Sequence, residues 1–175
     1  MNHYADFDDL DYLTNHLAGL YIRMGKYQAY HQWLDKEQEL LNQEKLEQEE
    51  CINYQIYIAR ERAEVFLHQK NYSESKSLCN AVIKQANIVD NQRTKNYAKH
   101  ILANIAIAEA NFSLAEQLLK EGYEEVESNK DKRRMAYYEA SFANLEKARG
   151  NLALAKQWKN QAQSRFNYLG MEPVS

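Results

Sequence analysis

The side chains able to do chemistry follow no catalytic or metal-binding arrangement in this sequence. Five histidines stand apart from one another, without an acidic partner at a characteristic spacing: His3, His16, His31, His68 and His100. Cys51 and Cys79 form no CxxC pair and are expected to be small apolar side chains on helix faces. Nucleophile, zinc and phosphate-loop motifs are missing, and the paired carboxylates lie in charged stretches. The sequence therefore predicts a protein that is not an enzyme and has no metal site or cofactor.

A column of tyrosines is the most regular feature of the chain. Its members are Tyr12, Tyr57, Tyr97 and Tyr137, at spacings of 45, 40 and 40 residues. Residues at equal offsets in a repeat form a row along the folded array. Two interpretations remain open. The rings pack between neighbouring units with their hydroxyls reaching water or backbone, or they line a binding groove.

Two further columns run beside the tyrosines. Three residues along stand Asn15, Arg60, His100 and Ala140, and four beyond those stand Gly19, Glu64, Asn104 and Asn144. The amides of Asn104 and Asn144 each offer a donor and an acceptor, which suits an extended peptide backbone, although a polar wall that contacts only water fits equally. Arg60 can receive a carboxylate, unless Glu61 or Glu64 pairs with it. The candidate binding residues are Tyr57, Arg60, Glu64, Tyr97, His100, Asn104, Tyr137 and Asn144.

The same spacings recur in four short segments typical of turns. These are Gly25-Lys26-Tyr27, Lys70-Asn71-Tyr72, Ala110-Asn111-Phe112 and Gly150-Asn151-Leu152. Seven residues before them lie Ala18, Ala63, Ala103 and Ala143, and five residues after their first members lie Tyr30, Ser75, Ala115 and Ala155. Three columns in one register predict an internal repeat of two helices around a tight turn. The alanines are expected where helices cross closely, and the asparagines at helix N-caps, with Asn71 and Glu74 as a capping box.

These patterns place eight helices along the chain. They are expected at about 5–24, 27–50, 51–69, 72–88, 92–109, 112–128, 131–149 and 152–169, so that the five additional residues of the first interval fall in a long second helix. The predicted fold is a single all-α domain over 1–175, with units at about 5–50, 51–90, 91–130 and 131–170. One proline and five glycines in 175 residues agree with an all-helical chain.

The columns resemble the tetratricopeptide repeat, which has a small residue and then an aromatic in its first helix, and an alanine early in its second. Ala18 with Tyr21, Ala63 with Phe66, and Ala115 with Leu119 fit this signature. The family's tryptophan and closing proline are missing, Lys159 occupies an aromatic place, and the period is about 40 instead of 34. The resemblance implies a right-handed α-α superhelix of about four helix pairs. Repeats this long, and the final segment 162–171, are similar to sensor regions of bacterial signalling ATPases and peptide-responsive regulators.

The resemblance implies a non-catalytic scaffold or sensor that binds a peptide or protein segment in a concave groove. An assembly element, or a regulatory fragment of a larger signalling protein, is the alternative, and a small-molecule sensor is a third reading that needs an enclosed pocket. Trp158 is relevant to the hypothesis that the chain is an assembly element. It either forms an end-face contact, such as a homodimer through the C-terminal helix, or lies flat against its own helix pair.

Charge and hydropathy predict the surroundings of the protein. The net charge of −3 gives no basic footprint for nucleic acid, and no apolar run is long enough for membrane insertion. The first residues lack the basic start and apolar core of a signal peptide. We therefore expect a cytoplasmic protein whose partners are proteins or peptides.

Overall fold

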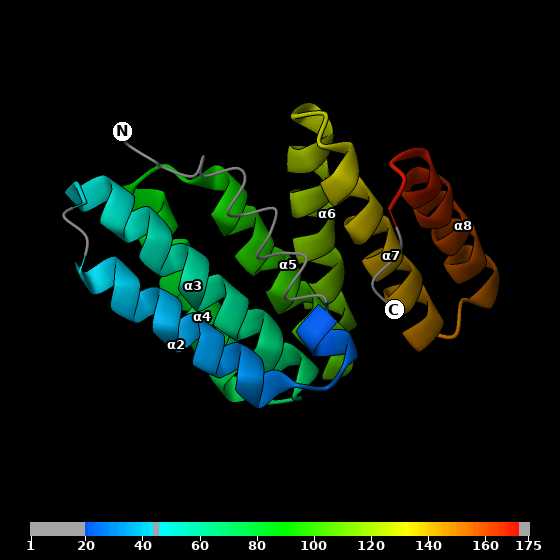
Figure 1. The fold of residues 1–175 in the computed structure, drawn as a ribbon. Coiled ribbons are helices and arrows are strands. Elements are labelled where there is room, and N and C mark those ends of the chain that lie inside the picture. The colour runs from blue at the N-terminus through cyan, green and yellow to red at the C-terminus, as the bar shows by residue number, and fades with distance from the viewer. Residues whose placement is uncertain (1–19, 44–45, 172–175) are drawn as a thin grey trace.

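The structure, a computed structural model, describes residues 20–43 and 46–171, and these contain helices and no strand (Figure 1). Residues 20–23 are helical, and seven helices follow: α2 (Tyr27–Gln43), α3 (Gln48–His68), α4 (Tyr72–Ile88), α5 (Gln92–Ala108), α6 (Phe112–Ser128), α7 (Lys132–Ala148) and α8 (Leu152–Tyr168). From α4 onward the bounds agree with the predicted ones to within one residue. Most of the first predicted helix, at 5–24, lies outside the described residues.

The turns that follow α3, α4, α5, α6 and α7 share one backbone conformation. A residue with positive φ recurs every twenty residues, at Lys70, Asp90, Ala110, Lys130 and Gly150. After α3, the amide of Lys70 donates to the carbonyl of Leu67 (3.0 Å) and the amide of Asn71 to that of Phe66 (2.8 Å). This bond pair is the Schellman motif, which satisfies the last carbonyls of a helix and reverses the chain within three residues. The equal turns explain why α4 to α8 are each 17 residues long.

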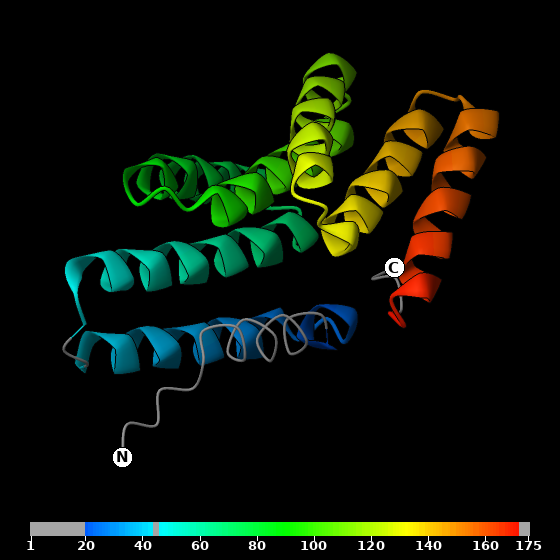
Figure 2. The same cartoon turned by 90° about the horizontal axis from the view of Figure 1, so that it is seen from above.

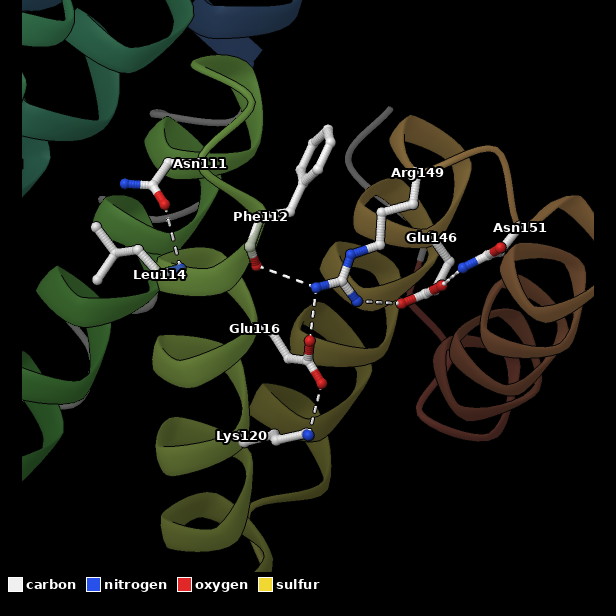
Figure 3. Close-up of polar contacts among 8 residues, drawn as sticks. All are labelled: Asn111, Phe112, Leu114, Glu116, Lys120, Glu146, Arg149 and Asn151. Carbon is white, nitrogen blue, oxygen red and sulfur yellow. Dashed lines mark hydrogen bonds and ion pairs between the residues drawn. The ribbon is translucent and has the colours of Figure 1, made fainter.

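Polar residues after these turns begin the next helix. Three side chains each accept a hydrogen bond from a backbone amide three residues on, Asn91 from Thr94, Asn111 from Leu114 (Figure 3) and Asp131 from Arg134. Such bonds satisfy donors that the first helical turn leaves unpaired. Asn71 makes no side-chain cap bond, so the predicted capping box with Glu74 is wrong. Asn151 makes none either, and its amide instead donates to Glu146 at 2.6 Å (Figure 3).

The second helix is shorter than predicted. It was expected over 27–50, but α2 ends at Gln43 and α3 begins at Gln48. The backbone of Glu47 is extended (φ −63°, ψ 152°), and its amide donates to the Glu50 carboxylate at 3.2 Å. The acidic residues Glu47, Glu49 and Glu50 therefore form the start of a helix and not the middle of one. Most of the extra length of the first interval lies in α3, which has 21 residues.

The helices stack in chain order from α2 to α8 (Figure 2). Each contacts its neighbours in sequence, and α3 also contacts α5, and α5 contacts α7. Within the described residues the backbones of α4 and α6, and those of α6 and α8, do not lie close to each other. The side formed by α3, α5 and α7 is called the inner face below.

The small-residue columns lie inside the stack. Ala63, Ala103 and Ala143 are buried, and so are all four members of the second column, Tyr30, Ser75, Ala115 and Ala155. Ser75 Oγ donates to the Ala63 carbonyl at 2.7 Å, so the two columns meet where α3 and α4 cross. Close crossing requires small side chains at the contact. Ala63, Ala103 and Ala143 are thus buried as predicted, whereas Tyr30 is a large residue in the second column and Ala18 lies outside the described residues.

Candidate binding site on the inner face

The eight predicted binding residues all lie on α3, α5 and α7. Tyr57, Arg60 and Glu64 come from α3, Tyr97, His100 and Asn104 from α5, and Tyr137 and Asn144 from α7. Of the four other members of the columns, Ala140 is half-buried on α7, and Tyr12, Asn15 and Gly19 lie outside the described residues. The inner face therefore takes equivalent residues from three successive helices, as the equal spacings predict.

A stack of aromatic rings and guanidinium groups joins the three helices. The Cζ of Arg60 lies 4.9 Å from the Tyr57 ring centroid and 4.2 Å from that of Tyr97, and the Cζ of Arg134 lies 3.0 Å from the Tyr97 centroid. Guanidinium groups are attracted to the electron-rich faces of aromatic rings. This packing between neighbouring units is one of the two interpretations left open for the tyrosine column.

Arg60 already has a carboxylate partner. Only 5% of the residue is exposed, and its Nη2 lies 2.5 Å from Glu61, which also accepts a bond of 2.7 Å from the Tyr30 hydroxyl. The pairing with Glu61, which the sequence left as an alternative, is therefore present. A buried arginine that is stacked and paired in this way positions the neighbouring tyrosines.

A closed ring of hydrogen bonds links α5 to α7. Ser141 Oγ donates to Asn104 Oδ1 at 3.0 Å, and Asn104 Nδ2 donates to the His100 carbonyl at 3.1 Å. His100 Nε2 lies 2.8 Å from Ser141 Oγ, and because the serine proton is already directed at Asn104, we assign the imidazole proton to Nε2. Burial, together with the charge of Arg134, lowers the pKa of His100 to about 4, so the ring is neutral at pH 7. Both functional groups of the Asn104 amide are thus engaged within the protein.

Asn144 and Glu64 differ from Asn104 in their exposure. Asn144 is exposed, and the Glu64 side chain is 38% exposed, with Oε1 at 3.5 Å from His68 Nε2. Burial pushes the pKa of Glu64 upward, but the hydrogen bond and charge of His68 bring it below its ordinary value. The same contact raises the pKa of His68. These two polar side chains, one at each end of the inner face, remain accessible to a ligand.

Trp158 and Tyr137 make ring contacts inside the stack. Trp158 stacks on Phe142 with centroids 4.8 Å apart and approaches the edge of Tyr123. Tyr137 meets Phe166 edge-on at 5.2 Å, and burial raises its pKa. Trp158 therefore packs toward α6 and α7. This is the packing that the sequence left open beside an end-face contact.

Sequence reasoning missed a buried carboxylate at the C-terminal pair. Glu139 is fully buried and accepts two bonds from Arg165, Nε at 3.0 Å and Nη2 at 2.7 Å. Gln161 and Tyr123 donate to it as well, at 2.8 and 3.1 Å. The cluster takes residues from α6, α7 and α8, so the spacing of residues within one helix does not predict it. The sequence did contain one indication, because the residues one helical turn before and after Glu139 are apolar: Met135, Ala136, Phe142 and Ala143.

The described ranges 20–43 and 46–171 contain neither a metal-ligand cluster nor a helix that could span a bilayer. No cluster of three or more His, Cys, Asp or Glu side chains there could hold a metal ion. No helix in the same ranges is long and apolar enough to span a bilayer. Cys79 is buried, which raises its pKa to about 12, and Cys51 is half-buried and free. Both cysteines thus lie on helix faces, as the sequence predicts.

Comparison with known proteins returned no match. No protein-family model, no curated protein and no solved structure matches this chain. The inner face itself is therefore the basis for assigning a function.

Proposed function

We propose that the chain is a non-catalytic binding module, a tetratricopeptide-like superhelix that receives a peptide or protein segment on its inner face. The observation that carries this proposal is the fixed geometry of that face. The stack of Arg60, Tyr97 and Arg134 and the ring of His100, Ser141 and Asn104 tie α3, α5 and α7 together. A surface held in place before binding loses little entropy when a ligand arrives. The proposal includes a right-handed superhelix with a period of about 40 residues, a cytoplasmic location and a role in signalling.

The ligand contacts fall to the side chains that remain exposed to solvent on the inner face. Asn104 positions its neighbours, because both groups of its amide are engaged with His100 and Ser141. Asn144, which is exposed, offers a donor and an acceptor to a peptide backbone. Glu64 offers a carboxylate near the other end of the face. An extended segment with a basic residue toward α3 fits this arrangement best.

The test uses peptides selected from a random library displayed on phage. Peptides that bind the wild-type chain are synthesised, and their dissociation constants are measured for Asn144→Ala and Glu64→Gln. Asn80→Ala and Glu74→Gln on α4 are the matched controls, since both residues are exposed and lie on an outer helix. Loss of one hydrogen bond corresponds to a change of about 0.5–1.5 kcal/mol, or roughly two- to tenfold in affinity.

The proposal predicts that both inner-face variants weaken binding and that both α4 variants retain wild-type affinity. Circular dichroism of all four variants is expected to match wild type. Peptides whose affinity falls only with the α4 substitutions, or with none of the four, would overturn the inner face as the binding surface.

A further inference from the structure

Each even-numbered helix before α8 carries a stripe of four residues that the following odd-numbered helix covers. The stripe takes the first, fifth, eighth and twelfth residues of the helix. It comprises Tyr27, His31, Leu34 and Gln38 on α2, Tyr72, Lys76, Cys79 and Ile83 on α4, and Phe112, Glu116, Leu119 and Tyr123 on α6. The eighth residue is fully buried in all three helices, in clusters that include residues of the next helix. The stripe is thus the surface on which the next helix of the stack packs.

The fifth residue of each stripe contacts the C-cap residue of the covering helix. His31 Nε2 lies 3.5 Å from Gln69 Oε1, Lys76 Nζ lies 2.6 Å from Glu109, and Arg149 Nη2 lies 2.5 Å from Glu116 (Figure 3). The first junction has a histidine and a glutamine, and the next two have oppositely charged pairs in reversed order. An exchange of neighbours between the last two junctions would bring like charges together, so the pairs favour the correct order of the stack.

The equivalent stripe on α8 is open in the described structure. Its members Leu152, Lys156, Lys159 and Gln163 are all exposed, Leu152 at 68%. Lys159 stands where Leu34, Cys79 and Leu119 are buried. The α8 sequence has three basic residues and no acidic one. The α8 stripe therefore has the same place on its helix as the covered stripes of α2, α4 and α6, but it is exposed and basic.

We propose that the α8 stripe docks an acidic helix of a partner protein, in the way that α5 covers α4. The contact between Lys76 and Glu109 provides the template. The partner helix would place an acidic C-cap residue opposite Lys156 and a second acid, one turn earlier, opposite Lys159. A second copy of the described helices is disfavoured as the occupant, because the C-cap residues Gln69, Glu109 and Arg149 already pair within the chain. The proposal is independent of the inner-face function.

The probe for this surface is the α5 segment itself. A stapled peptide of residues 92–111 carries Ile105→Glu, so that glutamates at 105 and 109 lie one turn apart on one side of the helix. A second peptide carries lysine at both positions. Fluorescence anisotropy measures both against the full chain, against Lys156→Glu/Lys159→Glu, and against Lys84→Glu/Lys130→Glu. The last variant makes the same change of net charge at exposed sites elsewhere.

We expect the full chain and the control variant to bind the acidic peptide at least about tenfold more tightly than the basic one, with the preference reduced at high salt. The Lys156→Glu/Lys159→Glu variant should reverse the preference. Equal binding of the two peptides, no binding of either, or an equal loss in the control variant would overturn the proposal. So would a wild-type dimer in sedimentation that Lys159→Glu dissociates, because the occupant would then be a second copy. None of these outcomes bears on Asn144 or Glu64, so the two proposals fail separately.

Discussion

Three buried or half-buried glutamates differ in how the protein neutralises them. Glu139 has a two-pronged contact with Arg165, and Glu61 has Arg60 and the Tyr30 hydroxyl. Glu37 on α2 has a buried Oε2 for which the described residues provide no hydrogen bond. A buried charge is tolerated only with a partner, and otherwise the group takes up a proton. Two residue-scale predictions follow from this contrast.

Replacing Arg165 should be strongly destabilising. Arg165→Ala leaves the fully buried Glu139 without its cation, and we expect a loss of about 3–5 kcal/mol in the free energy of unfolding. Adding Glu139→Gln should recover part of the loss, because the buried charge is then removed. Urea denaturation measures both variants. Lys159→Ala on the same helix is the control and should change stability by less than about 0.5 kcal/mol. Strictly additive effects of Arg165→Ala and Glu139→Gln would contradict the pairing.

Replacing Glu37 should change how stability depends on pH. Burial, and repulsion from Glu61, raise the pKa of Glu37 from 4.5 to about 7. The folded state therefore binds the proton more tightly, and this carboxyl lowers stability as pH rises from about 4.5 to 7. Glu37→Gln should be more stable than wild type at pH 8 by about 1–2 kcal/mol, with little difference near pH 4. Denaturant titrations at both pH values measure the effect, with the exposed Glu39→Gln as control. A gain of equal size at both pH values would argue against this origin.

At the scale of helix pairs, the crossings differ in which of the two helices supplies the larger side chain. Gly122 on α6 accommodates Tyr138 of α7, whose hydroxyl would lie 2.1 Å from a Cβ at position 122. One unit earlier the corresponding residues are Val82 and Ala98, both buried in one cluster. The larger residue of the pair is therefore on the first helix at one crossing (Val82 on α4) and on the second helix at the next (Tyr138 on α7). The Tyr138 hydroxyl also bonds to Asn96 at 2.9 Å, so the exchange adds a polar contact between α5 and α7.

Gly122→Ala should destabilise the α6–α7 crossing by about 1–3 kcal/mol, although alanine is the better helix former. Tyr138→Phe should not relieve the clash, because two ring carbons lie at 2.5 and 2.6 Å from the added Cβ. Tyr138→Ala should make Gly122→Val tolerable, since the pair then matches Val82 and Ala98. Thermal unfolding of the single and double variants tests this, and a neutral Gly122→Ala would show that the helices can separate at no cost.

At the scale of the whole molecule, contacts join near neighbours only. The middle helix α5 contacts α3, α4, α6 and α7, whereas α8 packs against α7 and, among the other described helices, meets only α6, through the Trp158 ring. Stability in such arrays is close to a sum of unit and interface contributions, so the reach of a defect depends on its position.

Two matched substitutions should show this dependence. Ala103→Leu in α5 and Ala155→Leu in α8 both enlarge buried alanines, and each should cost about 1–3 kcal/mol. Hydrogen exchange measured by mass spectrometry should quicken from α3 to α7 in the first variant and only in α7 and α8 in the second. Identical exchange patterns in the two variants would mean that the array unfolds as one cooperative unit.

The sequence by itself determined where most helices begin and end and which residues meet at their crossings. Both depend on local chemistry, because left-handed turn residues such as Lys70 recur at fixed intervals and small residues such as Ala63 and Ala103 repeat in register. It also placed the candidate site on one face, since equal offsets in equal units must align.

Only the tertiary structure decided which side chains on that face are already engaged. Asn104 and Asn144 share a register, but Ser141 holds one and leaves the other exposed. Glu139 meets Arg165 across 26 positions, and Trp158 packs on Phe142 instead of facing outward. The break between α2 and α3 was missed because a charged run suits a helix interior and a helix start alike. Such pairings depend on distances between separate helices, which the spacing within a helix does not determine.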